Sequence, residues 1–288
     1  MKKTMLAALL TLLAQSVWAG VQYDFVQNTQ SDIEQIPPTH LTGRAVIDGD
    51  RSRVDFVGGN IYAPGAYVVS TNGSRTLAFV DPVSKSYSLI NAAAIANAYG
   101  SQNVTVTNLK THLETLPDKP VIAGVPASHY MLTITYEMTV RYGPLPLQQS
   151  VREDIEKWTT TRFGDVVTNF FAGGSIRTGN AELDKVIDAE TTLIKGFPLR
   201  QKTLITTTNP RGTLPGTNIP LNNIRTQQSE LQIQSIKPIS AADSLFEIPA
   251  SYQRVENAQQ ANLNRGPKMT VLSFDGDKPQ ESPQENPQ

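Results

Sequence analysis

The 288-residue sequence predicts a mainly β fold with a few helices, built around an antiparallel sheet. Three observations support this fold class. Apolar and polar residues alternate with period two along many segments, which is typical of strands with one buried face. Turn residues separate these segments, as they do in β-hairpins. Helical spacing of apolar residues is clear in one segment only.

The first part of the chain is predicted to form a meander of hairpins. Asp48-Gly49 and Asn72-Gly73 each separate two strand-like segments and suit type I′ turns, and Asp81-Pro82 begins a third turn. The strands predicted over the whole chain are residues 21–29, 43–47, 51–56, 67–71, 75–80, 86–90, 104–113, 129–142, 149–160, 199–208 and 229–237.

The longest alternation predicts one strand that ends at Tyr142 and has unusual length. It would run roughly 45 Å at about 3.3 Å per residue, well beyond an ordinary strand. A sheet with strands of this length must twist and coil strongly, as in an open barrel.

Residues 181–195 predict an amphipathic helix that lies over the sheet. Asn180 is placed to cap its start and Gly196 to end it. Residues 91–99 and 162–171 are weaker helical candidates, and prolines and glycines in residues 209–223 indicate a loop. The residues that recur along the predicted helix at spacings of three and four are Leu183, Val186, Ile187, Glu190 and Ile194.

One face of the long strand and one face of this helix are the candidate ligand pocket. Tyrosines and a methionine among aliphatic residues suit a pliable pocket for acyl chains or a packed core, and residue type alone favours the core, because most apolar strand faces are simply buried. A helix that covers the strand completely gives a core, whereas partial cover gives a cavity. The candidate pocket residues are Tyr130, Leu132, Ile134, Tyr136, Met138, Leu183, Val186, Ile187 and Ile194.

The N-terminal segment predicts export. Lys2 and Lys3 precede an apolar run at residues 5–14, and Val17-Trp18-Ala19-Gly20 supplies a small-residue cleavage site after Ala19. The apolar run spans about 15 Å as a helix, half of a bilayer core, so residues 1–19 are interpreted as a signal peptide rather than an anchor. No cysteine is present to carry a lipid. We therefore expect a periplasmic mature chain with no transmembrane helix.

Composition and motifs exclude several activities. The 25 basic and 26 acidic residues nearly cancel, so no electrostatic footprint for nucleic acid exists. The absence of cysteine excludes thiol chemistry, and no cofactor or phosphate motif occurs. Residues 173–177 lack the last glycine of a serine-hydrolase elbow. His40, His112 and His129 have no metal-binding spacing, so no metal site and no enzymatic activity are predicted.

A run of acidic residues needs separate interpretation. Glu153, Asp154 and Glu156 suggest glycosidase carboxylates by type. In a strand, however, Glu153 and Asp154 point to opposite faces, and Arg152 and Lys157 are close enough to neutralise them. We therefore predict a solvated edge strand here.

Several blocks occur in a characteristic order along the chain. The first are residues 43–56 (GRAVIDGDRSRVDF), 64–70 (PGAYVVS), and 80–82 (VDP) with Lys85 and Tyr87. The later ones are residues 122–126 (IAGVP), leading into His129-Tyr130, then 195–200 (KGFPLR) and 244–252 (SLFEIPASY). Over residues 21–255 this order resembles an uncharacterised exported family related to the LolA/LolB lipoprotein-carrier fold.

The resemblance implies a half-open, strongly twisted antiparallel β-barrel with a helical lid, extending over residues 20–256. Its concave face would be lined by apolar side chains, the shape that holds acyl chains in the lipoprotein carriers. Residues 257–288, rich in Pro, Gln and Asn, are predicted to be a disordered tail.

Three functions remain open at this point. The leading hypothesis is a periplasmic, monomeric binding or carrier protein for a lipid, an acyl chain or another apolar ligand. The second is a non-catalytic envelope assembly or structural factor that binds a protein partner and has a filled barrel. The third is a hydrolase whose site is built from scattered residues.

Overall fold

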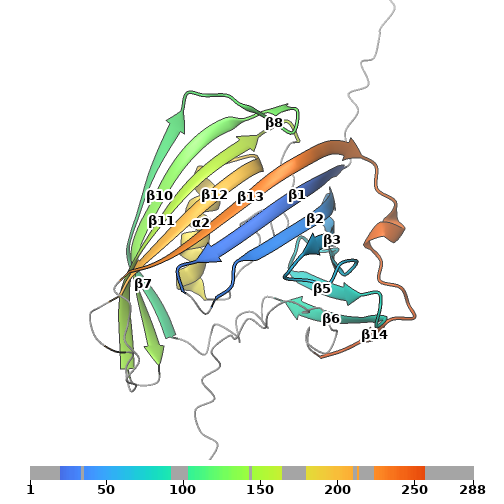
Figure 1. The fold of residues 1–288 in the computed structure, drawn as a ribbon, viewed down its shortest axis with the longest axis horizontal. Helices are drawn as coiled ribbons and strands as arrows, with labels where there is room; N and C mark the ends of the chain where they lie inside the picture. Colours follow the sequence, from blue (N-terminus) through green and yellow to red (C-terminus); the bar gives the residue numbers. More distant parts are fainter. Residues whose placement is uncertain are drawn as a thin grey trace, which may run out of the picture.

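The computed structural model describes residues 20–33, 36–91, 103–142, 145–163, 180–209, 213 and 224–256. Its main element is a twelve-stranded sheet with the order β14-β6-β5-β4-β3-β2-β1-β13-β12-β11-β10-β7 (Figure 1). The strands of this sheet are β1 (Gly20–Ser31), β2 (Thr39–Asp48), β3 (Arg51–Gly59), β4 (Tyr67–Ser70), β5 (Thr76–Asp81), β6 (Ser86–Asn91), β7 (Asn103–Leu116), β10 (Ser128–Tyr142), β11 (Leu145–Thr160), β12 (Phe197–Thr208), β13 (Ile224–Ile239) and β14 (Gln253–Arg254).

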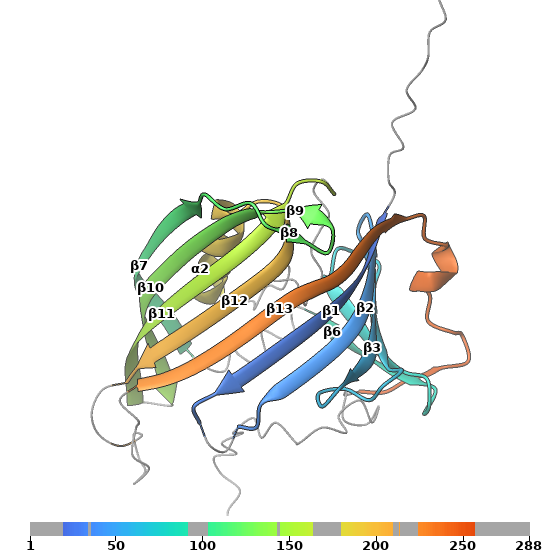
Figure 2. The same cartoon turned by 45° about the horizontal axis from the view of Figure 1, so that its top comes forward.

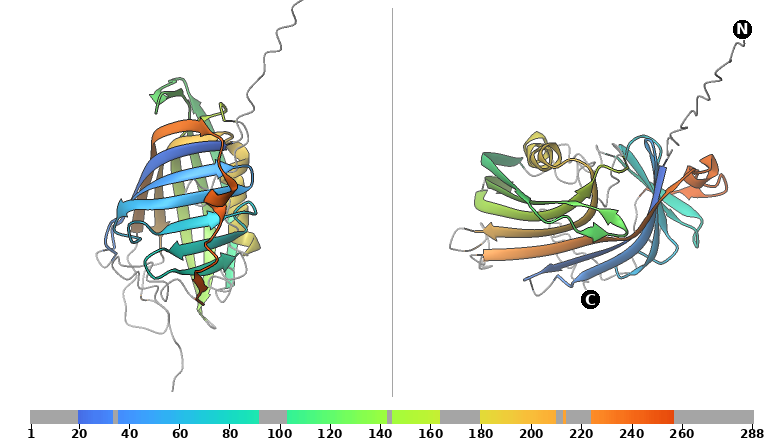
Figure 3. Two further views of the ribbon diagram at one scale, coloured as in Figure 1. Left: turned by 90° about the vertical axis from the view of Figure 1, so that its right-hand side faces the viewer. Right: turned by 90° about the horizontal axis from the view of Figure 1, so that it is seen from above.

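Three smaller elements accompany the sheet. Strands β8 (Val121–Ile122) and β9 (Val125–Pro126) form a hairpin at the end of β10 (Figure 2). Helix α2 (Ala181–Leu193) lies on one face of the sheet, which we call the inner face. The 3₁₀ helix η1 (Asp243–Phe246) lies on the opposite, outer face (Figure 3).

The sheet is strongly curved but remains open. Every pair of neighbouring strands is antiparallel except β14 and β6, which are parallel. Within the described residues β7 pairs only with β10, and β14 only with β6, so both edges are unclosed. The prediction of a mainly β fold with a large antiparallel sheet is confirmed, whereas the half-open barrel is an open, curved sheet in this structure.

The meander of hairpins forms as predicted, with its turns displaced by one residue. The first loop is Gly49-Asp50, where Gly49 alone takes a positive φ (63°), so the predicted type I′ turn is wrong there. In the second loop Gly73 and Ser74 both take positive φ (67° and 64°), as a type I′ turn requires.

Aromatic residues fill the inner face of strands β1–β6. Phe56 stacks on Tyr62 with ring centroids 4.0 Å apart, and Tyr23 packs edge-on against Phe197 at 5.2 Å. Gly43 makes room for this core, because a Cβ at this position would lie 2.6 Å from the Phe25 ring. These residues form one buried cluster, which also includes Phe197 and Leu199 of β12 and Leu231 and Ile233 of β13.

The segment after β13 covers the outer face of the same strands. Phe246 of η1 is buried against Val46, Tyr67 and Val80, and the Arg51 guanidinium lies 4.7 Å from its ring centroid. Beyond it, β14 pairs with β6. Strands β4 and β5 are thus buried on both faces, and the same segment also packs on the outer face of β2, β3 and β6.

Several predictions fall outside the described residues. These are the signal peptide (1–19), the serine elbow (173–177), the tail (257–288), nearly all of both weak helices (91–99 and 162–171), and nearly all of the loop (209–223). In the part of the chain that is described, no helix has the length and apolar character needed to span a bilayer.

Candidate ligand-binding site

Helix α2 has the ends that the sequence predicts. The Asn180 side-chain oxygen accepts hydrogen bonds from the backbone N–H groups of Glu182 (3.0 Å) and Leu183 (3.3 Å). Beyond the helix, Gly196 takes a positive φ of 98°, and a Cβ there would lie 2.8 Å from the Thr160 carbonyl oxygen. Only glycine fits this turn, which returns the chain from α2 to β12.

The structure brings most of the candidate pocket residues into one cluster. Leu132 and Ile134 of β10 are 0% exposed and pack with Ile155 of β11 and with Val186 and Ile194. Tyr130, Tyr136 and Leu183 are partly buried at the margin of this cluster. Met138 and Ile187 are half-buried and are not among its members. With α2 in this position, Leu132 and Ile134 at the centre of the cluster are shielded from solvent.

The alternation along β10 is unbroken, so its inward-facing residues are those predicted. Its pairing with β11 runs without a register shift from Ser128 to Tyr142. The irregularity between β10 and β7 lies in β7, where Asn108 takes a positive φ of 55°. Leu132 and Ile134 therefore share the inner face with α2.

A polar network lies beside this apolar cluster. The Lys157 ammonium group of β11 is 2.8 Å from the Glu190 carboxylate of α2, with side-chain exposures of 6% and 18%. Close by, the Tyr136 hydroxyl donates a 2.8 Å hydrogen bond to Glu153. Burial raises the pKa of the Glu153 carboxyl, and the negative charge of Glu190 acts in the same direction.

Sequence reasoning missed the ion pair, although one signal was present. Glu190 falls within the apolar stripe of α2, at the i+4 position from Val186. A carboxylate at such a position needs a buried partner. Lys157 was instead assigned to neutralise the neighbouring acidic residues of its own strand.

The acidic run of β11 does not lie on an edge strand, and that prediction was wrong. β11 pairs with β10 on one side and β12 on the other. The opposite facing of Glu153 and Asp154 is confirmed, since Asp154 bonds Thr133 and Arg152 on the outer face. Arg152 does neutralise Asp154, and this contact lowers the pKa of the Asp154 carboxyl.

The histidines lie on three different strands. His129 is buried on β10, with its ring nitrogens 2.6 Å from Asp118 and 3.1 Å from Glu156. His40 lies on β2 and its Nδ1 is 2.6 Å from the Asn28 amide oxygen, whereas His112 is exposed on β7. Among the described residues, no group of three or more His, Asp or Glu side chains is arranged to hold a metal ion.

No family model and no curated protein matches the chain. Among solved structures, a LolA superfamily protein from Nitrosomonas europaea aligns over 80% of this chain and 90% of its own, with 12% identity and a TM-score of 0.29. PNGF-II aligns over 84% of this chain and 32% of its own, with 12% identity and a TM-score of 0.31.

Proposed function

We propose that the protein is a periplasmic binding or carrier protein for a lipid, an acyl chain or another apolar ligand. The ligand is held between α2 and the inner face of β10 and β11. The observation that carries this proposal is the attachment of α2. Of the thirteen residues of the helix only Val186 is buried; the other attachments are the partly buried Leu183 and Ala189, the buried Ile194 at the C-cap and the Lys157–Glu190 ion pair. Such a helix is a cover that an apolar ligand can displace.

The free energy gained by burying an acyl chain can offset the free energy lost when α2 lifts from the cluster. Uncovering a side chain such as Leu132 or Ile134 costs about 1.5–3 kcal/mol. An acyl chain that enters beneath the lifted helix contributes about 0.8 kcal/mol for each CH₂ group it buries. A chain of moderate length therefore offsets the opening.

The ion pair fixes the position of the cover without holding it tightly. A buried ion pair gains little net stability, because desolvation of both charges cancels most of their attraction. Lys157 belongs to the sheet and Glu190 to the helix, so the pair separates when α2 lifts. The negative charge of Glu190 is close enough to raise the pKa of the Glu153 carboxyl. Glu153 is therefore a second carboxyl group near Glu190 when the ion pair separates.

One observation favours the competing function, an envelope assembly factor with a filled interior. Leu132 and Ile134 are fully buried while α2 is in place, as they would be in a permanent core. Mass spectrometry of lipid extracted from protein purified out of its native compartment separates the two functions. The carrier is expected to bring a lipid with it, and absence of lipid supports the assembly factor.

A matched pair of variants tests the role of α2. Lys157→Met breaks the buried pair and is expected to raise the association rate of a fluorescent fatty acid about tenfold, which corresponds to about 1.4 kcal/mol of weaker closure. Lys185→Met is the control, because it breaks an exposed pair with Glu182 (2.7 Å) on the same helix. If neither the wild type nor either variant binds the probe, the carrier proposal is rejected.

Export belongs to the same proposal and has its own measurement. Cleavage after Ala19 gives an exported chain that begins at Gly20, the first residue of β1. Amino-terminal sequencing of the exported protein checks this, and a sequence that begins at Met1 or Lys2 would contradict it.

A further inference from the structure

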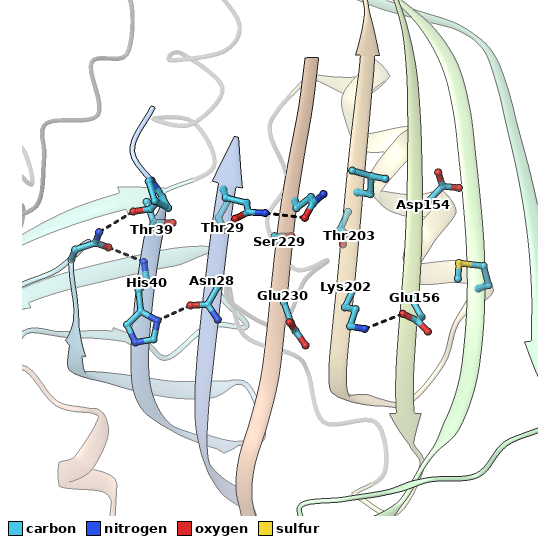
Figure 4. A pocket seen from close by; sticks show the side chains of 16 residues that line it. Asn28, Thr29, Thr39, His40, Asp154, Glu156, Lys202, Thr203, Ser229 and Glu230 are labelled. Atoms are coloured by element: carbon cyan, nitrogen blue, oxygen red, sulfur yellow. Dashed lines mark hydrogen bonds and ion pairs between the residues drawn. The ribbon is translucent and has the colours of Figure 1, made fainter. Parts of the chain in front are cut away.

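The outer face of the sheet carries a polar row that crosses six strands. Paired positions place one side chain from each strand in line, from β2 to β10. At about 4.8 Å between neighbouring strands the row extends about 24 Å. Figure 4 shows most of its members side by side. The residues of the row are His40, Asn28, Glu230, Lys202, Glu156 and Met131.

This row and the next one line a cavity of about 800 Å³. The second row contributes Gln30, Gln228, Leu204 and Asp154. The volume lies within the range of small-molecule sites, about 300–1,000 Å³. The cavity is on the face opposite α2, so it is separate from the proposed apolar site.

The charges that line this cavity already have partners. Asp154 is paired with Arg152 (2.7 Å), and Glu230 accepts a hydrogen bond from Arg200 Nε (2.8 Å). Glu156 lies 3.1 Å from His129 and 3.5 Å from Lys202. Each carboxylate thus has its own cation within the protein, and a charged ligand would meet no uncompensated charge. The lining favours a neutral ligand.

Hydrogen bonds within the protein orient the amide side chains of the cavity and leave other atoms of the same groups available to a ligand. Gln30 Nε2 donates to the Gln228 amide oxygen at 3.0 Å, and the Asn28 amide oxygen lies 2.6 Å from His40 Nδ1. Within the described residues, the other amide atom of Asn28, Gln30 and Gln228 has no hydrogen-bond partner. These groups supply one acceptor and two donors to a bound molecule.

Apolar side chains also line the cavity. Met131 and Leu204 lie among the polar groups. A sugar ring has the matching chemistry, because its hydroxyl groups both donate and accept hydrogen bonds and its ring C–H groups form an apolar face. One pyranose unit is also about as long as the spacing between two neighbouring strands. We propose that this outer-face cavity binds a neutral oligosaccharide laid across the strands.

The position of the cavity disfavours an extended peptide as the ligand. Peptides that bind sheets add to a free edge, where backbone N–H and C=O groups are unpaired. The cavity lies over β1, β13, β12 and β11, each of which is paired on both sides. Only side chains are available to a ligand there.

Saturation-transfer NMR with neutral homo-oligosaccharides of glucose, mannose, galactose and N-acetylglucosamine tests the proposal. At least one of them is expected to bind, and Gln228→Ala is expected to weaken its affinity at least tenfold. Gln227→Ala is the matched control, because this exposed neighbour on β13 points to the opposite face and does not line the cavity. The control is expected to retain wild-type affinity.

Three outcomes would overturn the proposal. These are the absence of binding to every neutral sugar, equal affinity of the wild type and Gln228→Ala, and a preference for a neutral extended peptide or an anionic glycan. Circular dichroism of both variants confirms that each is folded before its affinity is compared. The fatty-acid probe bound by the apolar site is expected to be unaffected by Gln228→Ala, so failure of one proposal leaves the other distinguishable.

Discussion

The two halves of the sheet differ in what covers them. Strands β1–β6, the N-terminal half, have an aromatic core on the inner face, and the segment containing η1 and β14 covers the outer face of β2–β6. Strands β7 and β10–β13, the C-terminal half, carry α2 on part of the inner face and a polar outer face. One continuous sheet thus joins a region buried on both sides to a region with exposed surface.

The sequence of each strand reflects this difference. All four residues of β4 are buried, as are all but one of the six in β5, so neither strand alternates. In β10, by contrast, Leu132 and Ile134 are buried, whereas Met131, Thr133 and Thr135 on the other face are only half-buried. Strands covered on both faces become continuously apolar, whereas strands covered on one face alternate. Binding surfaces are therefore expected in the C-terminal half.

The largest expected effect is in the aromatic core of the N-terminal half. Phe56→Ala removes a ring that is 1% exposed and stacked on Tyr62, and is expected to lower the free energy of unfolding by about 3–5 kcal/mol. Urea unfolding followed by circular dichroism measures this loss. A loss below about 1 kcal/mol would show that this core is not closely packed, and the contrast between the halves would fail.

Two isoleucine substitutions compare the halves directly. Ile47 and Ile134 are 2% and 0% exposed on the inner face of their respective halves. Overpacking costs about 1–3 kcal/mol in a rigid core, so Ile47→Trp is expected to lose at least that much stability. Ile134→Trp is expected to stay near native stability, because α2 can lift, and to lose binding of a fluorescent fatty acid. Equal destabilisation, with no probe binding by the wild type, would make both halves ordinary core.

The fold was largely predictable because alternation and turn residues are local signals. The long strand at residues 129–142 and the helix that begins at Ala181 appear with nearly the predicted limits. The short strands β8, β9 and β14 were missed, since two residues cannot show a period. β8 and β9 pair with each other in a tight hairpin, whereas the position of β14 depends on its pairing with the distant β6.

The candidate sites were only partly predictable, for a related reason. Alternation identified the face that contains Leu132 and Ile134, because facing is a local property of a strand. It gave no information about which strands are neighbours. The pairing of β1 with β13 joins residues about 200 positions apart, and the outer row depends on it. The Lys157–Glu190 pair joins a strand and a helix that are 33 positions apart in the sequence.

A smaller effect is expected from the buried carboxyl group of the C-terminal half. Burial raises the pKa of Glu153 in the folded state, so the folded protein holds this proton more tightly than the unfolded chain. Its contribution to stability is therefore favourable at low pH and is lost as pH rises from the unfolded pKa through the raised folded pKa. Glu153→Gln keeps an acceptor for Tyr136 and removes this loss.

The variant is accordingly expected to gain stability over the wild type at pH 7.5, and to gain less at pH 4. Urea unfolding at both pH values measures the difference. Glu137→Gln, at an outward-facing carboxylate bonded to Ser150, is the control and is expected to change stability equally at both. A larger gain at pH 4 than at pH 7.5 would contradict the assignment of Glu153 as a buried acid.

The smallest effect is expected from removal of the C-terminal tail. This prediction tests where the segment that covers the N-terminal half ends. The last backbone contact of that cover is the hydrogen bond from Val255 N–H to the Tyr87 carbonyl oxygen, at 2.8 Å. The composition of residues 257–288 offers too little apolar burial to offset chain entropy. Truncation after Glu256 is therefore expected to change the free energy of unfolding by no more than about 0.5 kcal/mol.

Truncation after Ile239 is the comparison, because it also removes Phe246 and β14 and exposes the outer face of β2–β5. If both truncations had the same effect in thermal unfolding, the segment around η1 would not be the cover that distinguishes the two halves.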